Sequence, residues 1–337
     1  MSLPITLIID DPGPLINVYW WHVAERAGTA RPTQESGEPV ARDIPVDFLE
    51  QFIEVIDRWG VRGKYTVLPY PAGLGPIDQG WPGCDRRDLE RWLDLARRHV
   101  APRMDITPEI LTHARALDLD TMAPLDLDER DWSIHQTAAT LTPYIERALL
   151  ILARVGLPAR GVTSPWDFGA QVEEEYRLAI RQAMARVSGA RQTWYFLHSD
   201  DVGTAFRSHV AWQEGDSWLV SLWAQVSDFL WGTMQHAPCE GGPVACERGY
   251  VRRLADAYLT EDGQAGRLTQ LFAAGTPMVL CTHWQSLYSN GRRCGLRALD
   301  EVCRRVHQVW GDQVQWTSCH QLAAAVASGQ YGGGSTA

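Results

Sequence analysis

The sequence repeatedly alternates a short apolar segment with a longer segment of helical periodicity, and this alternation constrains the fold most. Residues 4–9 are nearly all apolar, as expected for a strand that is buried on both faces of a parallel sheet. A helix is expected near 45–59, where large apolar residues recur on one face and Gly60 can terminate it. Repeated strand–helix units predict an α/β fold, with a parallel sheet and right-handed crossovers.

The same alternation continues to the end of the chain. Further strands are expected near 63–68, 103–107, 160–163, 193–197, 277–281 and 314–317, and further helices near 86–99, 142–156, 172–187, 266–274, 297–310 and 320–326. Thr142 and Pro143 are interpreted as the cap and first turn of the 142–156 helix. These units predict a distorted (β/α) barrel of about seven parallel strands.

One segment departs from the alternation. Residues 206–212 and 217–225 resemble two strands joined by Glu214-Gly215-Asp216, which indicates a β-hairpin. The hairpin is either an insertion into the barrel or an antiparallel extension of its core.

The length of 337 residues would fit two average domains, but barrels commonly reach this size as one unit. We find no linker and no internal repeat. Residues 1–328 are therefore predicted to form a single domain, and the Gly/Ser-rich residues 329–337 a disordered tail.

Composition excludes several classes of partner. The formal net charge is −10, and an acidic protein repels nucleic-acid phosphates. No apolar stretch reaches the roughly 20 residues needed to span a membrane. The chain has seven cysteines, an odd number, and its start lacks the pattern of a secretory signal. Both observations favour reduced thiols and a cytoplasmic location.

Polar residues follow several predicted strands. In parallel α/β barrels the active site lies at the carboxyl ends of the strands, so these residues are candidates for one shared site. The polar residues at these strand ends and their neighbours are Asp10 and Asp11 after the first strand, Glu109 to His113 after 103–107, Pro165, Trp166 and Asp167 after 160–163, His198, Asp200 and Asp201 after 193–197, and His283 and Trp284 after 277–281.

In this order, the segments resemble the motifs of the polysaccharide deacetylase family. An apolar strand ending in Asp10-Asp11 is similar to the family's first motif, and Glu109-Ile110-Leu111-Thr112-His113 to its second. Residues 163–169 resemble a degenerate version of the family's Arg-x-Pro-x-Gly motif. Residues 278–283 resemble its final motif, and residues 316–322 resemble its closing strand and helix. The resemblance implies that Asp10 is the general base, Asp11 and His113 are metal ligands, and His283 is the catalytic histidine.

The chain departs from the family pattern at two places. The second motif of the family carries another histidine four positions after the first, where this chain has Leu117. A third ligand must then come from elsewhere; His22 is the first candidate, with His283 and Asp105 as alternatives. The family's arginine, which pairs with the catalytic aspartate, is replaced by Thr163 or Ser164, and loss of that positive charge should alter the aspartate's pKa.

These observations predict a metal-dependent hydrolase, most simply a deacetylase of an N- or O-acetylated carbohydrate or similar amide or ester. Mixed histidine and carboxylate ligands suit a divalent metal, with zinc the first choice. The substrate, a small molecule or an oligosaccharide, is expected to contact Trp20, Trp21, Pro165, Trp166, Asp167 and Trp284.

Two alternatives stay open. A glycoside hydrolase of the same superfamily would need a second carboxylate, which Asp167, Asp200 or Asp201 could supply. A carbohydrate-binding relative could have kept the fold and lost the chemistry.

Overall fold

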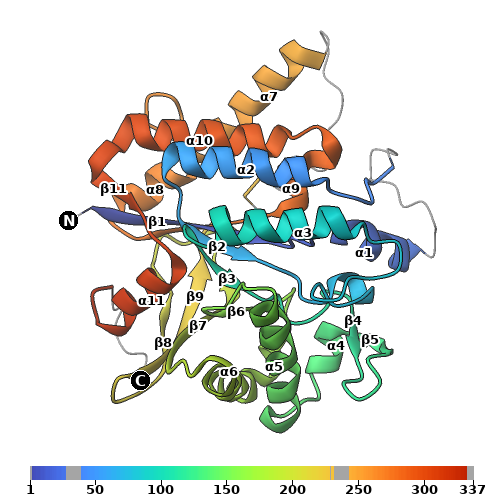
Figure 1. The fold of residues 1–337 in the computed structure, drawn as a ribbon. Coiled ribbons are helices and arrows are strands. Elements are labelled where there is room, and N and C mark those ends of the chain that lie inside the picture. The colour runs from blue at the N-terminus through green and yellow to red at the C-terminus, as the bar shows by residue number, and fades with distance from the viewer. Residues whose placement is uncertain (1, 28–38, 228, 231–242, 332–337) are drawn as a thin grey trace.

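The computed structural model describes residues 2–27, 39–227, 229–230 and 243–331 (Figure 1). Its strands are β1 (Leu3–Asp10), β2 (Gly63–Thr66), β3 (Met104–Thr107), β4 (Arg115–Leu117), β5 (Pro124–Asp128), β6 (Val162–Thr163), β7 (Gln192–Ser199), β8 (His209–Glu214), β9 (Ser217–Ala224), β10 (Met278–His283) and β11 (Val314–Trp316). Its α-helices are α1 (Val18–Ala27), α2 (Val46–Trp59), α3 (Arg86–Leu95), α4 (Glu129–Ser133), α5 (Ala138–Arg154), α6 (Glu173–Ser188), α7 (Pro243–Tyr258), α8 (Arg267–Ala273), α9 (Trp284–Tyr288), α10 (Cys294–Trp310) and α11 (Cys319–Ala327).

The strands form two main sheets. In the first, the order is β10-β1-β2-β3, with β11 also paired to β1, and all these pairings are parallel. In the second, the order is β6-β7-β9-β8. The predicted α/β class with a parallel sheet is therefore confirmed.

The predicted barrel of about seven strands is not confirmed, because the strands described do not form one closed sheet. In the described residues, the two sheets are linked by isolated parallel bridges, between Glu109 and Thr163 and between Val226 and Leu280, and by a few backbone hydrogen bonds beside them. At the first of these junctions Pro108 and Pro165 flank the bridging residues, and proline has no N–H to extend a ladder.

The predicted hairpin is present, but it is not an insertion. Strands β8 and β9 pair antiparallel, and β9 also pairs parallel with β7 along its whole length. Strand β9 is therefore part of the core sheet, and only β8 extends its edge.

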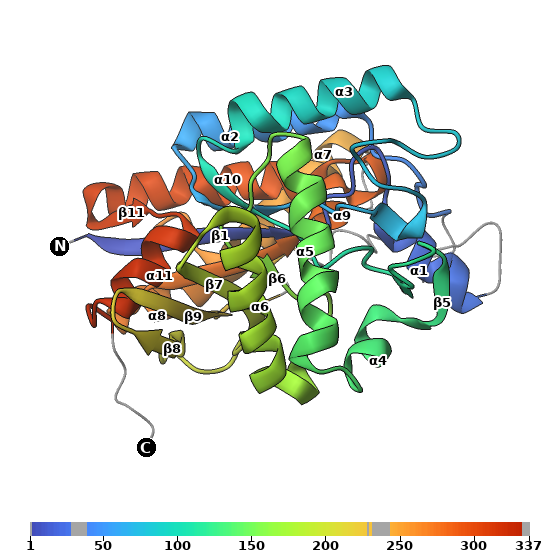
Figure 2. The ribbon, with the colours of Figure 1, turned by 60° about the horizontal axis from the view of Figure 1, so that its bottom comes forward.

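Helices cover the sheets on different sides. Helices α2, α3 and α10 lie together beside β1 and β2, whereas α5 and α6 pack against each other near β6 and β7 (Figures 1 and 2). Helix α2 buries Phe48, Leu49, Phe52 and Ile56, as its apolar periodicity predicts, and ends at Gly60 in a left-handed conformation.

Helix α5 begins earlier than predicted. Its cap is Thr137, which forms a capping box with Thr140. Thr142, the predicted cap, instead donates a hydrogen bond to the carbonyl of Ala138 at 2.6 Å within the helix, so Pro143 lies in the second turn. The sequence also failed to predict α1, α4, α7, α9 and the β4–β5 hairpin.

Residues 332–337 of the predicted tail lie outside the described residues. In the parts of the chain that are described, no helix is long and apolar enough to cross a membrane.

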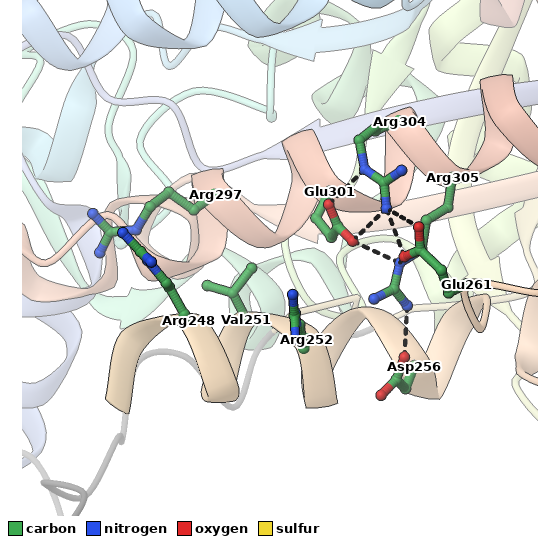
Figure 3. A pocket seen from close by; sticks show the side chains of 9 residues that line it. All are labelled: Arg248, Val251, Arg252, Asp256, Glu261, Arg297, Glu301, Arg304 and Arg305. Carbon is green, nitrogen blue, oxygen red and sulfur yellow. Dashed lines mark hydrogen bonds and ion pairs between the residues drawn. The ribbon is translucent and has the colours of Figure 1, made fainter. Parts of the chain in front are cut away.

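A groove of about 830 Å³ lies along α7 and α10 (Figure 3). At one end the side chain of Arg305, only 3% exposed, contacts Asp256 at 2.7 Å and Glu301 at 2.8 Å, while Arg304 contacts Glu261 at 2.6 Å. The guanidinium groups of α10 neutralise these carboxylates. The network therefore holds α10 against α7 and against the segment that follows α7.

Candidate active site

Asp10, Asp11, His113 and His283 line one cleft of about 560 Å³. Asp10 ends β1 and is in register with His283 on the adjacent strand β10, and Asp11 follows directly. His113 lies on the loop after β3. The cleft therefore forms where the carboxyl ends of these parallel strands meet, as the strand-end rule predicts.

Three buried side chains in this cleft could hold a metal ion. Among the described residues, ligand atoms of Asp11, Glu109 and His113 all lie within 4.8 Å of one another. Nε2 of His113 lies 2.8 Å from Asp11 Oδ1 and 3.4 Å from Glu109 Oε1. Glu109 begins the second motif, but nothing in its sequence context identified it as a ligand.

The charges of this trio fit a cation. Burial would raise the pKa of Asp11, but the positive charge of His113 acts against burial, and the pKa is lowered overall. Burial and repulsion from Asp11 raise the pKa of Glu109 to about 7. Burial works against protonation of His113, yet Asp11 and Glu109 raise its pKa well above the usual value. Without a metal, a proton on His113 thus offsets one of the two carboxylate charges, and metal binding would release that proton.

One buried oxygen supports the same interpretation. Oδ1 of Asp11 makes no hydrogen bond of acceptable geometry within the described residues, despite its short approach to His113. The other oxygen, Oδ2, accepts a hydrogen bond from Gln285. A buried carboxylate oxygen without a donor is costly, and coordination of a cation would satisfy it.

His22, the predicted third ligand, takes a different place. Its Nε2 lies 3.1 Å from Nδ1 of His113 and contacts the His113 carbonyl. Because Nδ1 and Nε2 lie on different edges of the imidazole, His22 meets the edge that does not face the carboxylates. Such contacts orient a metal-ligating histidine. Asp105, an alternative ligand, instead accepts from the backbone N–H of His320 at 2.6 Å.

The loop that carries His113 is organised by Glu129, which is fully buried. Ile110 and His113 both have positive φ angles, 45° and 53°, which non-glycine residues rarely adopt. The Glu129 carboxylate accepts the backbone N–H groups of residues 111, 112 and 113 at 3.2, 2.9 and 2.8 Å and the hydroxyl of Tyr144 at 2.8 Å. This side chain therefore fixes the backbone conformation that presents His113.

We expect Glu129→Gln to lower the free energy of unfolding by about 1–3 kcal/mol, because the new amide group cannot accept from a backbone N–H. Zinc affinity should fall by roughly 10-fold, as when a residue that orients a ligand is lost. Urea unfolding and a zinc-binding titration measure the two effects. Glu174→Gln is the matched control, since that side chain is 86% exposed. Equal effects of the two substitutions would contradict the role given to Glu129.

The positive partner of Asp10 comes from an unexpected strand. Lys64, on β2, is completely buried. Its Nζ contacts Asp10 Oδ1 and donates to the hydroxyls of Thr66 at 2.8 Å and Thr163 at 2.7 Å, which satisfies all three ammonium protons. The charge expected at position 163 or 164 is therefore supplied by Lys64, and Thr163 accepts a hydrogen bond from it. The feature of the sequence from which this ion pair could have been predicted is a lysine inside a short buried strand.

Only some of the predicted substrate residues line the cleft in the described part of the chain. Trp166 and Asp167 line the cleft; the Trp166 side chain is 37% exposed and its ring lies 4.7 Å from that of His113. Trp284 is only 1% exposed and packs against Phe48, Phe52 and Tyr65, so it belongs to the core and is not available to a substrate.

The remaining predicted substrate residues do not line the cleft in the described part of the chain. Trp20 and Trp21 pack against each other and beneath the guanidinium of Arg42, and Pro165 is buried. Their neighbour Tyr19 lines the cleft instead.

Neither a protein-family model nor a curated protein matches the sequence. Among solved structures, the fold is similar to that of a proposed polysaccharide deacetylase from Mycobacterium smegmatis, with a TM-score of 0.50, 16% identity, and coverage of 86% of this chain and 80% of that one. A mutant of a CE4 family pseudoenzyme also matches, with a TM-score of 0.37, 9% identity, and coverage of 89% and 63%. The first likeness shows a polysaccharide deacetylase-like fold, which confirms at the level of the fold the resemblance seen in the sequence.

Proposed function

We propose that this protein is a metal-dependent hydrolase that removes acetyl groups from an N- or O-acetylated carbohydrate. The observation that carries the proposal is the buried Asp11–Glu109–His113 trio, which shares one cleft with Asp10 and His283. Carboxylates and imidazole are ligand types that zinc accepts, and the trio supplies the three protein ligands of a catalytic site. Zinc is therefore the metal that we propose.

Each polar residue of the cleft has a distinct role in this proposal. Asp11, Glu109 and His113 would hold the cation. When bound there, a divalent cation supplies Lewis acidity to water and to the carbonyl oxygen of the acetyl group. Gln285 and His22 would orient Asp11 and His113 through the contacts described above.

Asp10 and His283 would move the protons. Asp10 accepts a proton from the attacking water, whose oxygen bonds to the acetyl carbon. His283 gives a proton to the leaving amine or alcohol as its bond to that carbon breaks, so that acetate and the deacetylated product result. Lys64 and Thr66 contact Asp10 Oδ1 and hold the carboxylate in place.

The surroundings of these groups suit a polyhydroxylated substrate. The half-exposed ring of Trp166 offers a flat apolar face, and sugar rings present an apolar C–H face to such groups. Hydrogen-bonding side chains line the same cleft, among them Asp128, Ser164, Asp167, Ser199 and Ser227. A short oligosaccharide is therefore the proposed ligand, with a few placed polar groups giving specificity.

We expect zinc-loaded protein to release acetate from oligomers of N-acetylglucosamine, and chelation to abolish the release. Asp10→Asn should keep its zinc and lower the rate by about 10²–10⁴-fold, the usual contribution of a general base. Acetate and zinc content are measured on the same samples, with Asp312→Asn, at an exposed position, as the control.

Two results would contradict this assignment. Unchanged acetate release by Asp10→Asn would remove Asp10 as the base. New reducing ends without acetate would favour a glycoside hydrolase instead. Because Asp10→Asn leaves Lys64 buried without a counter-charge, the same assays are run on Asp10→Asn/Lys64→Met, in which both partners are neutral.

A further inference from the structure

We infer that His198, oriented by Glu173, forms a hydrogen-bonding subsite for a hydroxyl group of the carbohydrate, away from the acetyl group that is cleaved. The inference rests on the proposed function and adds to it a residue that determines substrate affinity. His198 lines the same cleft as Asp10 and His283. It belongs to neither the metal-binding trio nor the proton-transfer pair.

The first step is the contact that fixes the imidazole. Nε2 of His198 lies 3.1 Å from Glu173 Oε1. The same oxygen accepts the hydroxyl of Tyr195 at 2.5 Å and lies 3.0 Å from Arg177 Nη2. Although burial raises the pKa of Glu173, hydrogen bonds from His198 and Tyr195 outweigh it and lower the pKa to about 2. Glu173 is therefore a carboxylate throughout the physiological pH range.

The second step is the tautomer that this contact imposes. A carboxylate can only accept, so Nε2 of His198 must carry a hydrogen, and in this tautomer Nδ1 is the acceptor. The ring also lies against the indole of Trp223, with centroids 4.5 Å apart and an interplanar angle of 31°. Both the plane and the hydrogen-bonding pattern of the ring are thus set before any ligand binds.

The third step is the backbone that aims the side chain into the cleft. Along β7 and β9, Phe196 pairs with Leu222, but His198 pairs with Trp223, so the register shifts around Leu197. Successive residues of a regular strand point to opposite faces, whereas a bulge redirects a side chain and is common beside active sites. Consistent with the bulge, residues 196, 197, 198 and 199 all line the cleft.

The chemistry of the ligand follows from this geometry. The cleft combines the imidazole acceptor of His198 with the side chains of Ser199 and Trp166. This combination suits a ligand that has an apolar ring and a hydroxyl group able to donate a hydrogen bond. A sugar hydroxyl is such a group. The side chain of His198 is 26% exposed, which leaves it accessible to a ligand.

The test is calorimetric binding of the tetramer of N-acetylglucosamine to the zinc-loaded protein. We expect His198→Ala to weaken binding by about 10-fold, the loss of one oriented hydrogen bond, with zinc content unchanged. Glu173→Gln should weaken it by a smaller factor, because the ring keeps its position against Trp223 but loses its fixed tautomer. His209→Ala, at an exposed position on β8, is the control.

Hydrolysis of 4-nitrophenyl acetate is measured on the same variants. This ester has no sugar, so His198→Ala should lower its kcat/KM much less than it weakens binding of the tetramer. A wild-type protein that does not bind the tetramer, or equal binding by wild type and His198→Ala, would overturn the subsite. An equal loss of ester hydrolysis would overturn it as well, since His198 would then act on the acetyl group. Binding that depends on His198 without any acetate release would support the subsite and refute the proposed deacetylation.

Discussion

Asp11→Asn is expected to lower zinc affinity by more than about 100-fold, the upper limit for loss of a residue that only supports a ligand. Asp11 is one of three candidate ligands, and catalytic zinc sites normally need three. Its Oδ1 lies 2.8 Å from His113 Nε2 but makes no hydrogen bond of acceptable geometry in the described residues. Removing the negative charge also leaves Glu109 as the one remaining carboxylate of the trio.

The choice of asparagine separates coordination from backbone strain. Asp11 has a φ of 65°, a left-handed conformation that aspartate and asparagine tolerate but that strains alanine. Asparagine also keeps an oxygen that can accept the hydrogen bond from Gln285. A loss of zinc in Asp11→Asn therefore reports the missing charge and ligand, whereas Asp11→Ala would combine both effects.

Zinc affinity is measured by competition with a chromophoric chelator at constant pH. Asp10→Asn is the matched control, because it removes the adjacent carboxylate without touching the trio. Equal zinc affinity in wild type and Asp11→Asn would show that the trio is not the metal site. His22→Ala distinguishes a ligand from an orienting residue: direct coordination predicts a loss as large as that of Asp11→Asn, while the observed contact with Nδ1 of His113 predicts a smaller one.

The strand-end rule predicted the site well where a residue's role depends on its position along the chain. Asp10 and Asp11 follow an unmistakable buried strand, and β10 adjoins β1, so His283 had to lie near them. No comparable rule applies inside a loop. His113 and Glu109 are brought together by a backbone that Glu129 holds in left-handed conformations, and that carboxylate lies sixteen residues away from His113.

Other residues were misplaced because their neighbours in sequence are not their neighbours in space. Trp284 follows His283 directly, but helix α9 begins there and turns the indole into the core against Phe48 and Phe52. His22 lies beside His113, but its place on helix α1 decides which edge of the His113 ring it meets. The predicted closed barrel is not confirmed, because β6 has just two residues, which are too few for a continuous ladder of hydrogen bonds between the two sheets.

Lys64→Met is expected to lower the free energy of unfolding by about 3–5 kcal/mol, the usual cost of removing one partner of a buried ion pair. Asp10 is only 5% exposed, so its charge would lose its counter-ion and gain little water in exchange. Methionine has a similar length and fills the same space, so the loss reports charge and not a cavity. Asp10→Asn alone should be costly for the same reason, since Lys64 is completely buried.

The double variant Asp10→Asn/Lys64→Met decides whether these two costs share one cause. Replacing both members of a buried ion pair by neutral groups is often nearly free, so the double variant should recover most of the stability lost by either single variant. The measurement is urea unfolding of metal-free protein, because a bound cation would itself compensate Asp10 in Lys64→Met. A coupling energy well above the experimental error is expected for residues in direct contact. If the two costs simply add, Lys64 does not neutralise Asp10, and the proposed support for the catalytic base fails with it.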